Sequence, residues 1–159
     1  MLGEVDEVMR KLLLQELPIQ RNQIDIKFDQ PKREWSARVS QPTINLFMYD
    51  LRENKILRQT GPQWLTIEAE DGTKYKQRRP VRMDLHYMIT AWATEPEDEH
   101  RLLSAALMSL LRHPYLPDEL LPESLQDQSV PIPLQIAQYD ELRNPSDIWS
   151  ALDNEVKPA

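Results

Sequence analysis

The sequence predicts an α+β fold in which helices pack on one side of a mostly antiparallel sheet and a β-hairpin projects from it. Two neighbouring stretches carry most of this prediction. Residues 81–93 alternate apolar and polar side chains, which is the period of a half-buried strand. Residues 96–111 place leucine and alanine three and four positions apart, as in a helix with one apolar face. We expect the rest of the chain to dock on this strand and helix.

The predicted strand over 81–93 has an inner face made of its odd-numbered residues. These are Val81, Met83, Leu85, Tyr87, Ile89, Ala91 and Ala93. The helix after it is expected to start with Thr94 as its cap, Pro96 in its first turn and Glu97 three residues after the threonine. Pro114 lacks a backbone N–H and ends the helix. The predicted apolar face of the helix consists of Leu102, Leu103, Ala106, Leu107, Leu110 and Leu111.

A helix and two strands are predicted at the start of the chain. Apolar residues at helical spacing between Leu2 and Leu13 predict an N-terminal helix that ends before Pro18. Residues 24–28 alternate in the manner of a short strand. Residues 43–51 are apolar on both faces, which is typical of a strand at the centre of a sheet.

A hairpin is predicted next. Strands at 64–70 and 73–76 flank Asp71 and Gly72, and this dipeptide supports the positive φ values of a two-residue turn. The outer positions of these strands are nearly all charged. We therefore expect the hairpin to project.

Shorter elements are predicted after the long helix. Residues 118–121 are expected to form a helical turn. Residues 132–136 alternate as a strand, and Pro133 inside the run predicts an edge position. A last helix is expected to begin at Asn144, with Pro145 in its first turn. Its buried side is predicted to be Ile148, Trp149 and Leu152.

Composition limits the class of protein. At 159 residues the chain has the length of one domain, which we assign to residues 1–153, with a frayed tail over 154–159. The chain has no cysteine, which excludes disulfides and thiolate metal sites. Its net charge of -7 opposes general attraction to nucleic acid or to an anionic membrane. No apolar run approaches the roughly 20 residues of a membrane span. We expect a protein that is cytoplasmic on synthesis and makes no membrane contact.

Motifs of enzymes are missing from the sequence, which has no P-loop, no dinucleotide fingerprint and no nucleophile elbow. No catalytic residue, cofactor or metal is therefore assigned. His100 follows Glu97 at the spacing of helical carboxylate metal sites, but such sites need two such pairs. A small metal-dependent enzyme that uses His86 and His100 remains the alternative from another class.

The predicted hairpin has two features that bear on binding. Its second strand opens a basic run that consists of Lys74, Lys76, Arg78, Arg79 and Arg82. A nucleic-acid patch and a solvated arm are both possible, but the acidity of the chain favours an acidic protein partner. Trp64 and Ile67 on the same hairpin either anchor an interface or fold back over the domain's own core.

Six stretches of the chain, taken in order, carry a family resemblance. They are residues 33–35, 41–50, 79–87, 97–103, 111–114 and 144–152. This ordered set resembles the N-terminal domain of the tube-terminator, or cap, proteins of extracellular contractile injection systems, which are phage-tail-like particles. The likeness extends over residues 4–152, and the ordered set carries it rather than any single motif.

This resemblance implies a non-enzymatic structural protein with a fold similar to phage tail terminators. It implies a homo-hexameric ring on the distal end of the inner tube, which contacts the tube and sheath proteins and ends their polymerisation. The finished particle is either released or attached to a membrane. Longer members of the family carry a second domain, so this chain is expected to be a short cap paralogue. A baseplate adaptor of the same particle is the alternative within the resemblance.

The predicted hairpin is a suitable arm for closing such a ring. A ring needs a heterologous interface that closes on itself, and an arm on one subunit that meets a sheet edge on the next provides one. We assign Trp64, Ile67 and Tyr75 to this contact. We expect Arg78 and Arg79 to face an acidic neighbour.

Overall fold

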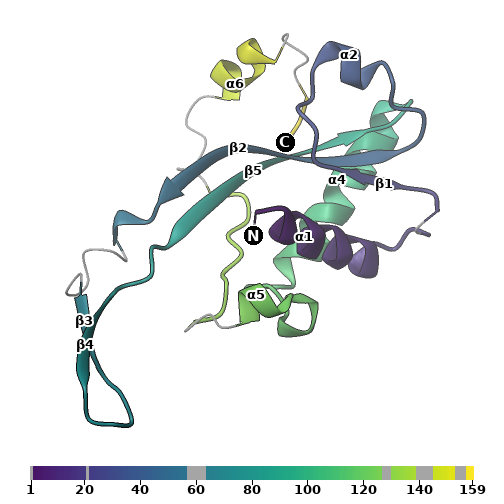
Figure 1. Ribbon diagram of the computed structural model, residues 1–159. Coiled ribbons are helices and arrows are strands. Elements are labelled where there is room, and N and C mark those ends of the chain that lie inside the picture. Colours follow the sequence, from purple (N-terminus) through teal and green to yellow (C-terminus); the bar gives the residue numbers. More distant parts are fainter. Residues whose placement is uncertain (1, 21, 57–63, 127–129, 139–144, 153–156) are drawn as a thin grey trace. The chain divides into compact units, whose positions relative to one another are not determined.

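A computed structural model of the chain describes residues 2–20, 22–56, 64–126, 130–138, 145–152 and 157–159 (Figure 1). The chain divides into two compact units. The first comprises Met1–Phe47 and Met88–Ala159, and the second comprises Met48–Tyr87. The structure combines helices with mainly antiparallel strand pairs, so the predicted α+β class is confirmed. One domain over residues 1–153 stays a prediction.

The larger sheet has three strands in the order β1 (Asp25–Lys27), β2 (Thr43–Glu53) and β5 (Met83–Trp92). β1 runs parallel to β2, with Ile26 opposite Ile44. The arrows of β2 and β5 point in opposite directions (Figure 1). β2 is therefore the central strand, as its apolar sequence predicts, and its first four residues are buried.

The inner face predicted for β5 is wrong. Met88, Thr90 and Trp92 are buried, whereas Val81 and Met83 are exposed. Ala91 is buried as well, so the end of the strand is covered on both faces. A strand that is enclosed at one end and open at the other does not follow a simple period of two. The alternation from Val81 to Ala93 therefore marks a strand correctly but not its buried side.

The predicted edge strand over 132–136 is also wrong. Among the described residues this stretch makes only an isolated bridge, in which Pro133 lies opposite Tyr115. The Leu116 N–H donates to the Ile132 carbonyl at 2.9 Å, and the Leu134 N–H donates to the Pro114 carbonyl at 2.9 Å. Prolines at both sides of this short pairing lack the N–H groups that would extend it.

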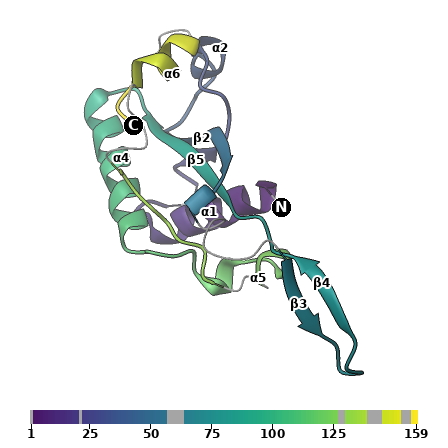
Figure 2. The ribbon, with the colours of Figure 1, turned by 90° about the vertical axis from the view of Figure 1, so that its left-hand side faces the viewer.

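Two long helices build the core of the first unit. α1 (Leu2–Glu16) buries Val8, Met9, Leu12 and Leu13, which confirms the predicted N-terminal helix. It lies beside α4 (Pro96–Leu111), as Figure 2 shows. The Glu16 carboxylate, at the end of α1, lies 3.4 Å from Arg112 and 3.3 Å from His113 Nε2. These contacts join the C-terminal ends of the two helices.

The start of α4 differs from the prediction. Glu95 is the cap residue, with no side-chain hydrogen bond, and Pro96 is the first helical residue. The expected role of Thr94 as a cap is therefore wrong. Glu99 takes the nearby contacts instead, because its carboxylate accepts the Ala93 N–H at 3.2 Å and pairs with the Lys157 ammonium.

Short helices complete the first unit. They are α2 (Arg33–Ser36), η1 (Asp118–Leu120), α5 (Glu123–Gln126) and α6 (Pro145–Ala151). The Trp35 ring of α2 meets Trp92 edge to face at 5.2 Å. The Lys157 ammonium lies 4.7 Å from the centre of the same Trp92 ring.

The predicted helical turn near 118–121 and the burial of Trp149 and Leu152 are confirmed, whereas Asn144, the predicted helix start, lies outside the described residues. In the predicted frayed tail over 154–159, residues 154–156 also lie outside the described residues.

Asn45 is a buried amide that fixes the loop after β1. Its side-chain oxygen accepts the Asp29 N–H at 3.0 Å, and its amide nitrogen donates to the Asp29 carbonyl at 2.9 Å. Asn45 is fully buried on the central strand. Removing it leaves two backbone groups of Asp29 without partners, which is the costly way to lose a hydrogen bond.

We predict that Asn45→Ala lowers the free energy of unfolding by about 2 kcal/mol. The matched control is Asn22→Ala, which removes the same side chain at an exposed position and should change stability by less than about 0.5 kcal/mol. Urea unfolding of the three proteins measures both values. Equal losses in the two variants would contradict the role of Asn45.

Candidate interface on the hairpin

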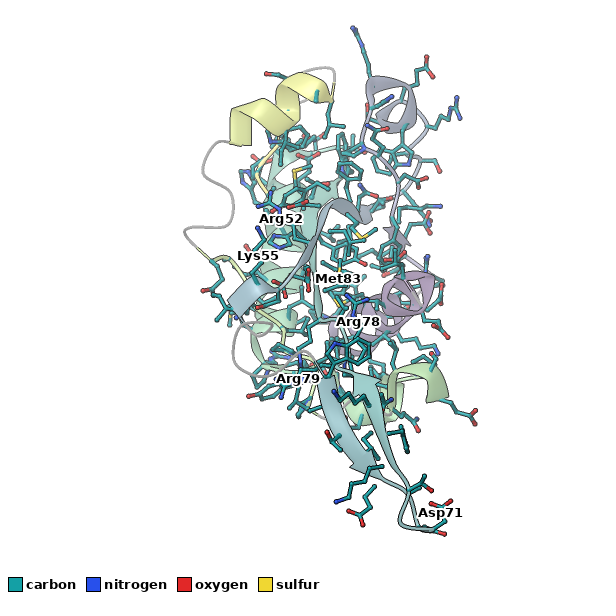
Figure 3. All side chains as sticks on the ribbon, turned by 60° about the vertical axis from the view of Figure 1, so that its left-hand side comes forward. Arg52, Lys55, Asp71, Arg78, Arg79 and Met83 are labelled. Atoms are coloured by element: carbon teal, nitrogen blue, oxygen red, sulfur yellow. The ribbon has the colours of Figure 1, made fainter. Side chains whose placement is uncertain are left out.

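The hairpin lies wholly in the second unit. It consists of β3 (Trp64–Glu68) and β4 (Lys74–Arg78), which pair in antiparallel register. Among the described residues these strands pair only with each other. Figure 3 shows Asp71 at the turn and Arg78 and Arg79 at the opposite end of the ribbon. The predicted hairpin is confirmed as an element.

The turn differs from the predicted two-residue type. The Ala69 N–H donates to the Thr73 carbonyl at 2.9 Å, and the Gly72 N–H donates to the Ala69 carbonyl at 2.9 Å. Three residues therefore separate Ala69 from Thr73. Gly72 has a φ of 82°, whereas Asp71 has no positive φ. A glycine in the left-handed region that closes a three-residue loop explains why Gly72 follows Asp71.

The pairing register sorts the hairpin residues onto two faces. Residues directly opposite each other share a face, and the faces alternate along each strand. One face carries Trp64, Thr66 and Glu68 opposite Arg78, Lys76 and Lys74. The other carries Leu65 and Ile67 opposite Gln77 and Tyr75. We call these the basic hairpin face and the apolar hairpin face, the latter defined by Leu65, Ile67 and Tyr75.

The residues predicted to form one interface therefore divide between two faces. Trp64 and Arg78 lie opposite each other on the basic face, whereas Ile67 and Tyr75 lie opposite each other on the apolar face. Arg79 follows the end of β4. Trp64 is 54% exposed and Tyr75 is 50% exposed, and every residue of β4 is exposed. Trp64 and Tyr75 are thus not buried in the chain's own core, whereas Ile67 is half-buried.

Among the described residues, no third strand pairs with the two strands that carry the apolar hairpin face. An isolated two-stranded hairpin is only marginally stable in water, and it gains stability when one face packs on something else. Leu65 and Ile67 are half-buried, and Tyr75 opposite Ile67 is exposed. Exposed aromatic and aliphatic side chains beside arginine are typical of interface anchors. The arrangement can therefore bind a protein surface.

The two units differ strongly in charge. Residues 48–87 contain 8 Lys and Arg and 6 Asp and Glu, which gives a net charge of +2. The remaining residues contain 11 Lys and Arg and 20 Asp and Glu, which gives -9. On the hairpin itself, Lys74 Nζ lies 3.5 Å from the Glu68 carboxylate. The chain as a whole is therefore acidic, although its second unit has a net positive charge.

A second exposed apolar surface lies on the first unit, and two of its residues, Leu107 and Leu111, belong to the apolar face predicted for α4. Leu102, Ala106 and Leu110 of the predicted apolar face of α4 are buried. Four residues on or just after this helix are instead large, apolar and exposed. We call them the α4 strip: Leu107 (38% exposed), Met108 (55%), Leu111 (53%) and Tyr115 (51%). The apolar face predicted from the sequence is wider than the part of α4 that the core buries. This extra width is the feature of the sequence from which an exposed apolar surface could have been predicted.

The histidines of the metal-site alternative lie in different units. His86 is in the second unit, where its ring meets Tyr49 edge to face at 6.0 Å, and His100 is an exposed residue of α4 in the first unit. In the part of the chain that the structure describes, no group of three or more His, Cys, Asp or Glu residues could hold a metal ion. Within the same part, every helix is too short or too polar to cross a membrane.

The model of the Pvc16 N-terminal domain family matches residues 4–159 of the chain. The chain belongs to this family. No curated protein matches it. The match to the Pvc16 N-terminal domain confirms the family resemblance predicted from the ordered stretches of the sequence.

A solved structure similar to this Pvc16 N-terminal domain is a cryo-EM structure of the PVC sheath/tube terminator, from an extracellular contractile injection system in its extended state. The two chains align with a TM-score of 0.69 and 21% sequence identity. The alignment covers 99% of this chain and 52% of the terminator chain, so this chain spans about half the terminator's length. The likeness shows a common fold.

The pKa of Asp71 depends on hydrogen bonds within the turn of the hairpin. The Asp71 carboxylate accepts the Thr73 hydroxyl and, at 2.9 Å, the Thr73 N–H, and these bonds lower the pKa of Asp71. A carboxyl group with a lowered pKa stabilises the folded turn at a pH above its ordinary pKa. This stabilisation is lost as the pH falls through the lowered value.

We predict that Thr73→Val raises the pKa of Asp71 toward its ordinary value, because the largest cause of the shift is removed. Thr66→Val, on β3 of the same hairpin, should leave the Asp71 pKa unchanged. An NMR titration of the Asp71 carboxyl carbon measures both. A titration of Asp71 that is the same in the Thr73→Val variant as in the parent would contradict the turn geometry.

Proposed function

We propose that this chain is a structural terminator subunit of a contractile injection system. In this role copies of the chain form a ring on the distal end of the inner tube and end the growth of tube and sheath. Membership of the Pvc16 N-terminal domain family over residues 4–159 is the observation that carries the proposal. The fold shared with a sheath/tube terminator supports it.

The ring is a homo-hexamer in this proposal, and the hairpin is the arm that joins neighbouring copies. Among the described residues its two strands pair only with each other, and an open edge or face is where another chain can add. Trp64, Ile67 and Tyr75 are the anchors, and Arg78 and Arg79 face acidic groups of the neighbour. Because the anchors occupy both faces of the ribbon, the arm is held between two surfaces.

The chain acts without catalysis in this proposal. Its partners are further copies of itself, the inner tube protein and the sheath protein. After synthesis in the cytoplasm it becomes part of a particle. A terminator needs only shape, apolar anchors and charge to stop polymerisation, because covering the last ring removes the surface on which the next ring adds. The exposed hairpin supplies anchors and charge.

We predict that replacing Trp64 and Ile67 together with serine prevents the hexamer from forming. The same variant should keep its free energy of unfolding within about 1 kcal/mol, because Trp64 is exposed and Ile67 is only half-buried. Native mass spectrometry measures the assembly, and urea unfolding measures the stability. A matched control is Thr66→Ser with Gln77→Ser, which changes polar positions on the same two faces.

An unchanged hexamer in the Trp64→Ser, Ile67→Ser variant would contradict the assignment of the hairpin. The terminator role has a separate test in cells that make the particle. Deleting the gene for this chain should give tubes of uncontrolled length. Tubes of normal length would contradict the terminator role even if the purified chain forms a ring.

A further inference from the structure

We propose that the α4 strip is the surface that receives the β3–β4 hairpin of a second copy of this chain. The inference rests on the ring proposed above and adds to it the receiving surface. The apolar hairpin face, Leu65, Ile67 and Tyr75, would pack on the strip formed by Leu107, Met108, Leu111 and Tyr115. Both surfaces are apolar, and the residues of the strip are between 38% and 55% exposed in the single chain.

The two surfaces match in spacing. Leu107 and Leu111 are four residues apart on α4, which places them about 6 Å apart along the helix axis. Leu65 and Ile67 are two residues apart on β3, which places them about 6.7 Å apart along the strand. Two rows of apolar side chains with nearly the same step can interdigitate. Met108 and Tyr75 then extend the contact on either side.

Charge selects the pairing between copies. The second unit has a net charge of +2 and the first has -9, so contacts between like units are disfavoured and contacts between unlike units are favoured. A contact between unlike units of two copies is heterologous, which is the kind of interface that builds a ring. The charge distribution therefore favours binding of the hairpin of one copy to the first unit of the next copy.

Acidic groups follow the α4 strip along the chain. Asp118, Glu119 and Glu123 are exposed on η1 and α5, three to eight residues after Tyr115. The ribbon is only two strands wide, and lysine and arginine have long flexible stems. Lys76 and Arg78 can therefore reach past the edge of the ribbon toward these carboxylates while the apolar face is buried.

The absence of cysteine makes a site-directed crosslink a direct test. One preparation carries Ile67→Cys and a second, distinguished by a mass tag, carries Met108→Cys. The two are mixed in equal amounts, allowed to exchange subunits, and oxidised. We expect a disulfide between one copy of each kind. The matched control is Thr66→Cys, which places the thiol on the opposite hairpin face, and its yield with Met108→Cys should be at least about ten-fold lower.

Three results would overturn the inference. A disulfide between two Ile67→Cys copies in preference to the mixed pair would indicate a symmetric contact. Closure within single chains of an Ile67→Cys, Met108→Cys double variant would show that the hairpin covers its own strip. A ring that forms by native mass spectrometry without the mixed crosslink would overturn this inference alone, whereas a chain that stays monomeric would overturn the proposed ring as well.

Discussion

The physical constraint on which this account depends is a ribbon of two strands that, among the described residues, pair only with each other. β3 and β4 satisfy each other's inner hydrogen bonds, but they cannot bury the side chains of Leu65, Ile67 and Tyr75 between them. Burial of apolar surface is the dominant favourable term in both folding and association. A ribbon whose apolar side chains stay partly exposed gains stability when another surface covers them.

The first unit has the opposite character. Its core is closed by two long helices, by the buried amide of Asn45 and by the contacts of Trp92 with Trp35 and Lys157. It is strongly acidic, and among its described residues the α4 strip is a group of large apolar side chains that are exposed. The acidic first unit and the second unit, with its net charge of +2, are complementary within one sequence, which favours contacts between unlike units of two copies.

Much of this organisation could be predicted from the sequence. The helices of Leu2–Glu16 and Pro96–Leu111 follow from their apolar spacing, and the central place of Thr43–Glu53 follows from apolar residues on both faces. The hairpin follows from charged strands around Asp71 and Gly72. These predictions succeed because local periodicity and turn chemistry determine the elements.

The buried faces of the elements and the grouping of the interface residues could not be predicted in the same way. They depend on which surfaces other elements cover, and apolar periodicity does not show this. Alternation along Met83–Trp92 predicted the strand but the wrong buried residues, because the strand is enclosed only at its end. The apolar spacing of α4 likewise included Leu107 and Leu111, which the core does not cover. The sequence grouped Trp64 with Ile67 in one interface. Only the pairing register of β3 and β4 shows that these two residues lie on opposite faces.

The central claim is that copies of this chain close into a ring at the end of a tube and that the hairpin makes the contact between neighbours. The most direct measurement is a cryo-EM reconstruction of the assembled particle in which this chain is located. The account predicts a ring of this chain at the distal end, with β3 and β4 of each copy covered by the next. Density for the chain along the shaft or at the baseplate, or a ring whose hairpins contact only solvent, would contradict it.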